Sequence, residues 1–464
     1  MKYLQHVVLI TGFFVCGCSV STSIKQPKVT YSEVWASEAE STDRVVQEWW
    51  KQFNDPVLER LISQASMANY DLLIAQSRVR EARAARGIVA ADALPVIGAS
   101  GSARRISTSE YTLDGNDGVT DTVFAAGFDA SWEIDLFGGN RSERRAADAL
   151  IDAAVNDRRD VMVSVLAEVA RNYIELRGSQ KRLLIIQRNV DLQRKTLDLV
   201  KSRVDSGFSR ELDQTRAEAQ LRETQSQVPL VRAEIRAAAF RLSILAGRSP
   251  ESLFEKLMTT EPLPVEPDIV PVGLRSDLLQ RRPDVRSAEA NLEAALSEVD
   301  AAKKELYPKF FLTGSAGFES LTFGDLLSSA AQTWTLGSLV EWPIFRSGEI
   351  RASIRVEEAR AKKAVLEFER IVLEALGEVE SSLTFYGEEL QARDRLKESV
   401  DAARRSVALA DNLYGRGLSS FLDVLEADGR LSETEDALVQ SETRTLTSLV
   451  ALYKSLGGGW ESFE

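Results

Sequence analysis

Histidine and cysteine are nearly missing from this chain of 464 residues, and neither occurs after residue 18. The single histidine is His6, and the two cysteines are Cys16 and Cys18. A chain that loses residues 1–17 would keep no histidine and one cysteine. Such a chain can form no internal disulfide, no Cys/His metal site and no Ser-His-Asp or Cys-His catalytic set. The sequence therefore predicts neither a catalytic residue nor a metal site.

Long apolar runs and an excess of positive charge are lacking as well. No run of 18 or more apolar residues is present, so the sequence predicts no transmembrane helix. The 57 basic residues are outnumbered by 70 acidic ones, and the net charge of −13 makes nucleic acid a poor partner. A pair of carboxylates of the glycosidase kind could be hidden among so many acids. Most charges fall on predicted helical faces, where solvation explains them, so we predict that the chain is not an enzyme.

The first 18 residues have the pattern of an export signal. Lys2 supplies the positive charge, and residues 7–15 form an apolar core of signal-peptide length that is too short to span a bilayer. Val15-Cys16-Gly17-Cys18 resembles a bacterial lipobox, which predicts a signal peptide at 1–17 and a covalent lipid on Cys18. That lipid would be the only group of cofactor type. The alternative is a plain secretory signal whose cysteines are removed with it.

The chain after the export signal is built as a tandem repeat. A glycine, a leucine and an aspartate recur at the same places in residues 207–213 and 417–423. The same spacing relates Leu221 to Leu431. Self-similarity over most of a chain is the mark of a duplicated structural unit.

We place the two repeats at residues 55–250 and 274–460. Each has the same plan, in which one helix is followed by two short strands around a polar loop and then by two long helices. A polar lead-in, residues 18–54, precedes them and would act as a tether. The joint between them, residues 251–273, is rich in proline. Clustered prolines disfavour regular helix and favour an extended connector.

Both repeats carry long heptad patterns. In residues 162–204 every seventh residue is apolar, and the same pattern runs through 372–414 with Arg393 as its one interruption. A sustained seven-residue period is typical of left-handed coiled-coil packing. Pro229 falls inside a predicted helix and is expected to kink or bulge it. We place the long helices at 140–206, 211–247, 348–414 and 420–456.

Four shorter segments alternate large and small residues. Each has about ten residues, which is the length of a tilted membrane strand, and an ordinary two-sided sheet is the alternative. Open strand edges are not tolerated in lipid, so four membrane strands could close only if the chain oligomerises. Polar loops at 106–121 and 319–332 would then be the outer tips, with the long helices in the periplasm. We place the strands at 95–105, 122–133, 308–318 and 333–343.

Five short motifs together resemble one known family. With the lipobox, they look like the TolC-type outer-membrane efflux protein family, in its lipoprotein (NodT/OprM-like) branch. The resemblance covers the whole chain after the export signal. The motifs are Trp49-Trp50 before Asp55-Pro56, Asp135-Leu136-Phe137-Gly138, Arg281-Arg282-Pro283-Asp284, Pro343-Ile344-Phe345, and Leu456-Gly457-Gly458-Gly459-Trp460.

The resemblance implies a mainly α-helical fold with a β-barrel portion. In the family, three chains form a homotrimer whose twelve-stranded β-barrel continues into an α-helical barrel. The trimer is a passive export duct, held in outer-membrane lipid and extending into the periplasm. It is opened by a periplasmic membrane-fusion adaptor and an inner-membrane efflux pump. The alternative function is a periplasmic coiled-coil scaffold lipoprotein that does not span the membrane.

The family's periplasmic gate follows the glycine that ends each long helix. The resemblance places this gate at Tyr414, Asp423 and Glu426 in the second repeat and at Asp213 in the first. Family members often carry aspartate at the position of Glu426. Threefold symmetry would gather three copies of Asp423 into a ring of like charge that binds cations and sets selectivity. The alternative is that Asp213 and Asp423 only cap the helices that follow them.

Overall fold

The computed structural model describes residues 47–107, 120–267 and 275–463, which form two compact units. The expected signal peptide and the lipidation site Cys18 lie outside the described residues, as does most of the lead-in. Within the described ranges, no helix is both long enough and apolar enough to cross a membrane.

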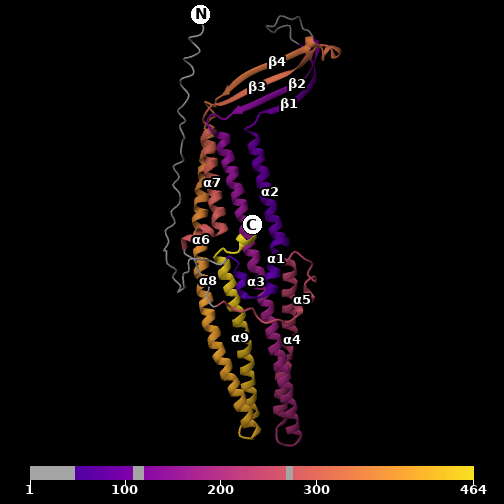
Figure 1. The fold of residues 1–464 in the computed structure, drawn as a ribbon, viewed down its shortest axis with the longest axis vertical. Helices are drawn as coiled ribbons and strands as arrows, with labels where there is room; N and C mark the ends of the chain where they lie inside the picture. The colour runs from indigo at the N-terminus through magenta and orange to yellow at the C-terminus, as the bar shows by residue number, and fades with distance from the viewer. Residues whose placement is uncertain (1–46, 108–119, 268–274, 464) are drawn as a thin grey trace. The chain divides into compact units, whose positions relative to one another are not determined.

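The sheet unit comprises residues 79–154 and 288–368 and holds one four-stranded antiparallel sheet. Strand order follows the chain, so each repeat supplies one hairpin of strands, and β2 pairs with β3 across the repeats (Figure 1). The strands are β1 (Val96–Ser107), β2 (Thr120–Ile134), β3 (Lys309–Ser320) and β4 (Gln332–Glu341).

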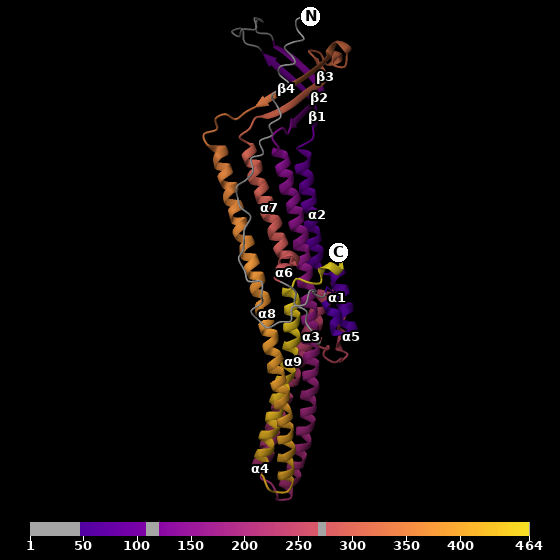
Figure 2. The same cartoon turned by 60° about the vertical axis from the view of Figure 1, so that its left-hand side comes forward.

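Helix segments from four helices complete the sheet unit, and they meet the strands at one end of the sheet (Figures 1 and 2). Each repeat leads into its strands from one helix and leaves them into another. The segments are the end of α2 (Tyr70–Ala91), the start of α3 (Gly139–Asp205), most of α7 (Pro283–Lys304) and the start of α8 (Glu349–Gly415).

The junction between strands and helices is duplicated together with the sequence. Trp132, at the end of β2, donates its indole N–H to the carbonyl of Ala93 at 3.0 Å. Trp342, just after β4, donates in the same way to the carbonyl of Leu306 at 3.2 Å. Each tryptophan therefore ties the end of a strand pair to the chain that leads into the same pair.

The segment between β3 and β4 is more ordered than the loop that the sequence predicts at 319–332. β3 continues to Ser320, and two 3-10 turns follow, Phe323–Asp325 and Ser329–Ala331. Phe323 packs edge-on against Phe124, with 5.6 Å between ring centroids. The aromatic contact folds the segment back onto the sheet.

The hairpin unit contains the other described residues, with α3 paired to α4 and α8 paired to α9 as two helical hairpins (Figure 1). Each hairpin turns at a glycine with positive φ, Gly207 at 77° and Gly417 at 74°, a conformation that favours glycine. α4 is helical on both sides of Pro229. The hairpin unit contains the larger parts of α3 and α8. Its other helices are α1 (Pro56–Ala68), α4 (Glu211–Leu245), α5 (Phe254–Met258), α6 (Arg275–Arg281) and α9 (Phe421–Ser455).

The two ends of the described chain form one aromatic core in the hairpin unit. Trp49 lies in a 3-10 turn, Trp49–Phe53, and is 1% exposed. Its ring stacks on that of Tyr453 of α9, with 5.2 Å between ring centroids. Trp50 stacks on Phe463 in the same way, with 5.5 Å between ring centroids. The last residues of the polar lead-in are therefore core residues rather than a tether, because this turn brings three large aromatic side chains inward.

Arg282, in the Arg-Arg-Pro-Asp motif, has a structural role. Its side chain is largely buried and donates to the carbonyl of Ser455 at 2.8 Å, and to Asp284 and Glu378 at 2.7 Å each. Burial alone would lower the pKa of this guanidinium, but the two carboxylates outweigh it and raise the pKa. The motif holds α7, α8 and the end of α9 together, so it marks the fold rather than a ligand site.

The proline-rich joint is not extended throughout, which corrects the prediction for 251–273. Residues Phe254–Met258 form the short helix α5, because the prolines flank this segment and leave its amide groups free. Phe254 stacks on Phe240 of α4 at 5.4 Å. Gln180 of α3 donates to the carbonyl of Leu257 at 2.8 Å. The joint is thus packed onto the first hairpin.

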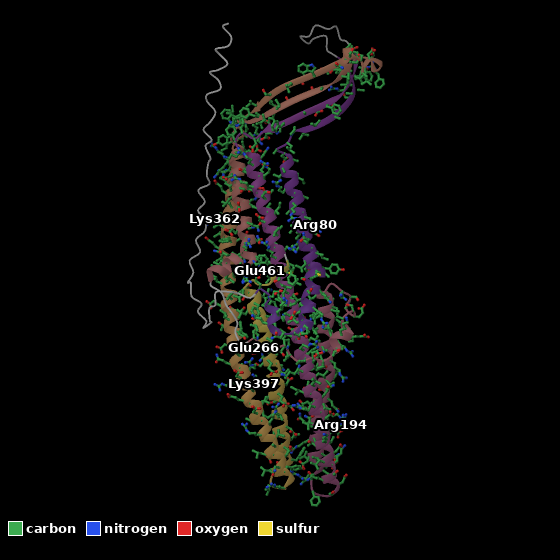
Figure 3. All side chains as sticks on the ribbon, in the orientation of Figure 1. Arg80, Arg194, Glu266, Lys362, Lys397 and Glu461 are labelled. Atoms are coloured by element: carbon green, nitrogen blue, oxygen red, sulfur yellow. The ribbon has the colours of Figure 1, made fainter. Side chains whose placement is uncertain are left out.

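The interruption of the second heptad pattern is explained by the same joint. Arg393 of α8 forms an ion pair with Glu266, which also accepts from the hydroxyl of Tyr386 at 2.6 Å. Figure 3 shows where Glu266 lies in the hairpin unit. A charged residue occupies this heptad position because Arg393 packs against Glu266 of the joint and not against an apolar side chain of another helix.

Candidate functional site

The register of the sheet sorts its side chains onto two unlike faces. Phe128 is paired with Ala99 of β1 and Ala316 of β3, and Ala316 is paired with Trp334 of β4. Side chains alternate along a strand, so these residues and every second neighbour share one face. We name it the apolar face after its large residues. They are Ile97, Phe124, Phe128, Trp132, Phe310, Leu312, Phe318, Trp334, Leu336 and Val340.

The opposite face, named the polar face, carries mainly hydroxyl and charged side chains. Ser315 and Thr335 are hydrogen-bonded across β3 and β4 at 2.8 Å on this side. A sheet with one apolar and one polar side separates two different surroundings. Polar residues on this face include Ser100, Arg104, Asp129, Ser131, Glu133, Thr313, Ser315, Thr333, Thr335 and Glu341.

The large side chains of the apolar face are uncovered in the described chain. Phe128 is 64% exposed, Leu336 is 73% exposed and Trp334 is 76% exposed. With Leu327 from the following segment, Phe128 and Trp334 line an open groove of about 520 Å³. A contiguous apolar surface of this kind marks a contact with lipid or with another protein. The outer edges of β1 and β4 also have no partner strand among the described residues.

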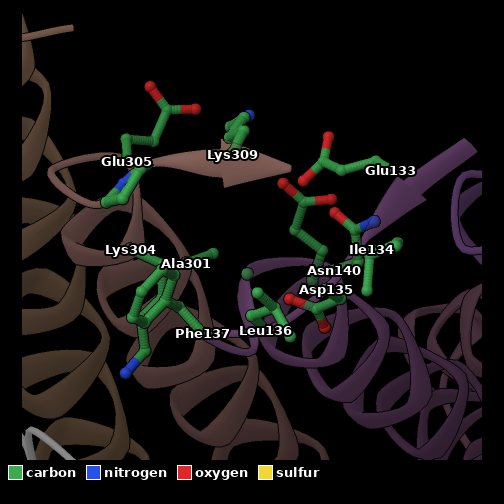
Figure 4. A pocket seen from close by; sticks show the side chains of 13 residues that line it. Glu133, Ile134, Asp135, Leu136, Phe137, Asn140, Ala301, Lys304, Glu305 and Lys309 are labelled. Atoms are coloured by element: carbon green, nitrogen blue, oxygen red, sulfur yellow. The ribbon is translucent and has the colours of Figure 1, made fainter. Parts of the chain in front are cut away.

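A small cavity of about 30 Å³ lies where β2 and β3 join α3 and α7. Figure 4 shows Glu133, Asp135 and Lys309 around it. The nearby Glu143 has a raised pKa, because burial disfavours its charged form and Glu298 repels it. A cavity of this size holds about one or two water molecules, so it belongs to the junction and is no ligand site. The described residues include no group of three His, Cys, Asp or Glu side chains that could hold a metal ion.

The acids that follow each glycine turn cap their helices. Asp213 accepts a hydrogen bond from the amide of Arg210 at 3.3 Å, and Asp423 accepts one from the amide of Ser420 at 2.8 Å. In each repeat the carboxylate thus satisfies the amide of the residue before the helix, and Asp423 also accepts from the hydroxyl of Ser420 at 3.0 Å. Asp213 is only 6% exposed, whereas Asp423 and Glu426 are exposed. The capping role predicted as an alternative is therefore present in both repeats.

Tyr414 lies between the two hairpins, with a partner that the sequence did not predict. The guanidinium of Arg203, near the end of α3, lies over the Tyr414 ring at 4.5 Å from its centroid. The Tyr414 ring also packs against the Phe421 ring, with 5.7 Å between the two ring centroids. Around them, Leu197 and Val424 belong to one apolar cluster built from both hairpins. The only sequence signal for Arg203 is its place beside the last heptad position, Val204.

Two further acids come together near the same tips. Burial and the neighbouring Asp411 raise the pKa of Asp428 to about 6. Burial also raises the pKa of Asp411 itself. Asp411 lies on α8 and Asp428 on α9, on opposite sides of the glycine turn. Sequence patterns did not single them out, because their proximity arises only when the hairpin closes.

Away from the tips, the hairpins are joined by ion pairs. Glu435 of α9 is 2% exposed and binds both Arg188 of α3 and Arg404 of α8. Arg182 of α3 binds Asp436 next to it. Together these contacts tie the first repeat to the second along α3 and α9.

The sheet has one apolar and one polar face, and the helical hairpins are duplicated with the sequence. The chain belongs to the outer membrane efflux protein family, whose model matches residues 61–248 and 274–458. The two matched segments correspond to the two repeats. The family resemblance and the mainly α-helical fold class predicted from the sequence are thereby confirmed.

Relatives match along nearly the whole chain. The pyoverdine export outer membrane protein OpmQ of Pseudomonas putida is 31% identical over 475 residues, covering 100% of this chain and 99% of its own length. The solvent efflux pump outer membrane protein SrpC of Pseudomonas putida is 30% identical over 456 residues, covering 96% of each chain. The solved structure of the outer-membrane channel OprN is 34% identical, covers 96% of this chain and 100% of its own, and has a TM-score of 0.89.

Proposed function

We propose that this chain is the outer-membrane channel subunit of an efflux or export system, through which cargo passes without being chemically changed. The observation that carries the proposal is the uncovered apolar face of the sheet, with exposed Phe128, Trp334 and Leu336 backed by a polar face. Lipid would cover the first face and water the second. Membership of the outer membrane efflux protein family supports the same function and the same location.

The open edges support a homotrimer. The described residues of one chain form four strands, and the β1 and β4 edges would be intolerable in lipid unless they were paired. Pairing β4 of one copy with β1 of the next would remove all edges in a closed ring. Three chains would give the twelve-stranded barrel that the family resemblance implies.

A covalent lipid on Cys18 would anchor the chain in the same membrane. The proposal rests on the lipobox-like Val15-Cys16-Gly17-Cys18 and on the apolar core before it. The lipid on this residue would be a second membrane attachment, in addition to the membrane-facing strands. We propose no other prosthetic group and no catalytic residue.

The gate is proposed at the hairpin tips, at Tyr414, Asp423, Glu426 and Asp213. Asp423 and Glu426 are exposed, so neighbouring copies could bring them into one acidic ring. A periplasmic adaptor and an inner-membrane pump would open it. This partnership follows the relatives, several of which are named as outer membrane proteins of efflux pumps.

The cargo is proposed to be chosen by the pump rather than by this chain. Relatives of similar identity are named for pyoverdine export and for solvent efflux, which are unlike cargoes. A duct whose wall is lined by hydroxyl and charged side chains suits passage of cargo that the pump has already selected.

The proposal is tested by purifying the full-length protein in detergent and adding it to planar lipid bilayers. We expect a β-rich trimer that resists dissociation in detergent until it is heated, and stepwise currents in potassium chloride. An acidic tip ring predicts that cations carry most of the current. A soluble, helical monomer that conducts nothing would overturn the assignment in favour of a periplasmic scaffold.

A further inference from the structure

One charged side chain lies among the described strand residues of the apolar face. Arg105 of β1 is paired with Thr122 of β2, which is on the same face as Phe128. Side chains alternate along a strand, so Arg105 shares this face, whereas its neighbour Arg104 is on the polar face. The two consecutive arginines of β1 are therefore turned to opposite sides of the sheet.

Arg105 stands near the end of β1 that is far from the helices, and it is exposed. Its side chain has no hydrogen-bond or ion-pair partner among the described residues. A cation that faces hydrocarbon is costly at the middle of a bilayer, but near the bilayer surface it can reach a lipid headgroup. The position of Arg105 and its unpaired guanidinium therefore suit an anionic group at the membrane surface.

The open groove of the apolar face has a mainly apolar lining. Ala126 and Ala316 form its floor, and Phe128, Trp334 and Leu327 surround them. A protein segment in this groove would leave backbone amide groups with few partners, whereas an acyl chain has no polar group to satisfy. The volume of about 520 Å³ is in the range of small-ligand sites. The lining therefore fits the hydrocarbon chain of a lipid better than it fits a peptide.

The guanidinium and the groove belong to strands that would meet in the proposed trimer. β1 and β4 are the two edges of the sheet, and closing the ring would pair β1 of one copy with β4 of the next. Arg105 is the third residue from the outer end of β1, and Trp334 is the third residue of β4. Antiparallel strands with level ends would place Arg105 of one copy opposite Trp334 of the next.

We propose that each pair of neighbouring copies binds one membrane lipid with an anionic phosphate headgroup. Arg105 of one copy holds the phosphate, and the groove beside Leu327 of the next copy holds one acyl chain. A guanidinium and a phosphate form two parallel charge-assisted hydrogen bonds, so Arg105 selects the headgroup while the groove accepts the chain of any lipid. The inference rests on the proposed channel function, and it adds a specific lipid to the surface that faces the membrane.

The test measures lipid selectivity through fluorescence quenching of Trp334, which lines the groove. The full-length protein is reconstituted into phosphatidylcholine vesicles that contain increasing fractions of phosphatidylglycerol with brominated chains. Bromine quenches tryptophan on contact, and the part of the quenching that disappears in Trp334→Phe belongs to Trp334. Phosphatidylcholine with the same brominated chains is the reference lipid without net charge.

Two neighbouring arginines provide the variant and its matched control. Arg105→Ala removes the cation of the apolar face, and Arg104→Ala removes the adjacent cation of the polar face. We expect the unmodified protein and Arg104→Ala to bind phosphatidylglycerol about fivefold more tightly than phosphatidylcholine, as one arginine near an anionic headgroup allows. Arg105→Ala should bind the two lipids equally, and Arg105→Lys should keep part of the preference.

Two further measurements separate the groove from the cation. Ala316→Leu fills the floor of the groove, so it should reduce the quenching of Trp334 by both lipids. Inorganic phosphate, added at constant ionic strength, should leave the preference for phosphatidylglycerol unchanged, because a free anion gains nothing from the groove. Loss of the preference in inorganic phosphate would show that Arg105 binds any phosphate, and it would overturn the lipid assignment.

Three other outcomes would overturn the inference while leaving the channel intact. They are equal binding of both lipids by the unmodified protein, an equal loss of preference in Arg104→Ala and Arg105→Ala, and quenching of other tryptophans without that of Trp334. The last outcome would mean that a neighbouring copy fills the groove. Absence of quenching at every tryptophan would instead contradict the membrane-inserted channel itself. Circular dichroism of each variant shows whether a change reflects the lipid or loss of structure.

Discussion

Among the acids near the tips, Asp423 combines a hydrogen-bonding role at a helix start with exposure to solvent. Asp423 accepts hydrogen bonds from the amide and the hydroxyl of Ser420 at the start of α9 and is nevertheless exposed. Capping and a place in an acidic ring are therefore compatible in this residue, although the sequence offered them as alternatives. Asp213 makes the same cap but is only 6% exposed, so its contribution to the proposed gate is the smaller one.

The pair of Asp411 and Asp428 gives stability that depends on pH. The pKa of Asp428 is raised from 3.8 to about 6, so the folded chain holds this proton more tightly than the unfolded chain does. The free energy of unfolding should therefore fall as pH rises through about 4 to 6, and stay lower above that range. Asp428→Asn removes the charge, and we expect it to stabilise the chain on the order of 1 kcal/mol at pH 7.5 but not at pH 4.

Thermal unfolding followed by circular dichroism at both pH values measures this effect. Glu433→Gln is the control, because Glu433 is an exposed acid of the same helix whose ion pair among the described residues is with Arg430, one turn away. An equal gain for Asp428→Asn at pH 4 and pH 7.5 would show that lost charge is not the cause.

At the scale of elements, the sheet depends on one pair of glycines. Gly127 of β2 is paired with Gly317 of β3, where the two repeats meet. A Cβ on Gly317 would lie 2.5 Å from the carbonyl oxygen of Ala126, which is backbone and cannot turn aside. We expect Gly317→Ala to destabilise the sheet by about 1–3 kcal/mol, as overpacking does.

The temperature at which the proposed trimer dissociates in detergent gels reports this loss. Gly337→Ala is the matched control on the neighbouring strand, where the nearest atom to an added Cβ is the hydroxyl of Thr313 at 3.7 Å. Equal dissociation temperatures for the two variants would mean that the backbones of β2 and β3 can move apart at no cost.

The elements that the sequence predicted well are those with a local repeating signal. The heptads at 162–204 and 372–414 predicted helices that the structure has as α3 and α8. α5 was missed because five residues between prolines are too few to show a period. The contacts of Arg203 with Tyr414 and of Arg188 with Glu435 were missed because each joins residues from different repeats, which no local pattern brings together.

At the scale of the whole molecule, neighbouring residues of β4 should differ in what they tolerate. Trp334 is on the apolar face and Thr333 on the polar face. A charge facing lipid costs about 2–4 kcal/mol near the middle of the bilayer, less for an acid, whereas one facing water costs little. We therefore expect Trp334→Glu to reduce the amount of this protein in the outer-membrane fraction, and Thr333→Glu to leave that amount nearly unchanged.

Fractionation of cells that produce each variant, with unheated detergent gels, measures both amounts. If Trp334→Glu reached the outer membrane as well as Thr333→Glu, the apolar face would not be turned toward lipid. Equal loss of both variants would indicate that any charge on β4 disturbs folding.

The tryptophan junction, repeated at Trp132 and Trp342, bears on the origin of the chain. An ancestor of half this length could have assembled as six identical copies, with the same junction and the same tip in every copy. In a chain that holds two copies, the two tips can differ in sequence, which identical separate chains do not allow. Arg203 and Val204 now stand where the second repeat has Leu413 and Tyr414. The guanidinium of the contact between Arg203 and Tyr414 comes from one half and the ring from the other, so the two halves of one chain now contribute different residues at the tip.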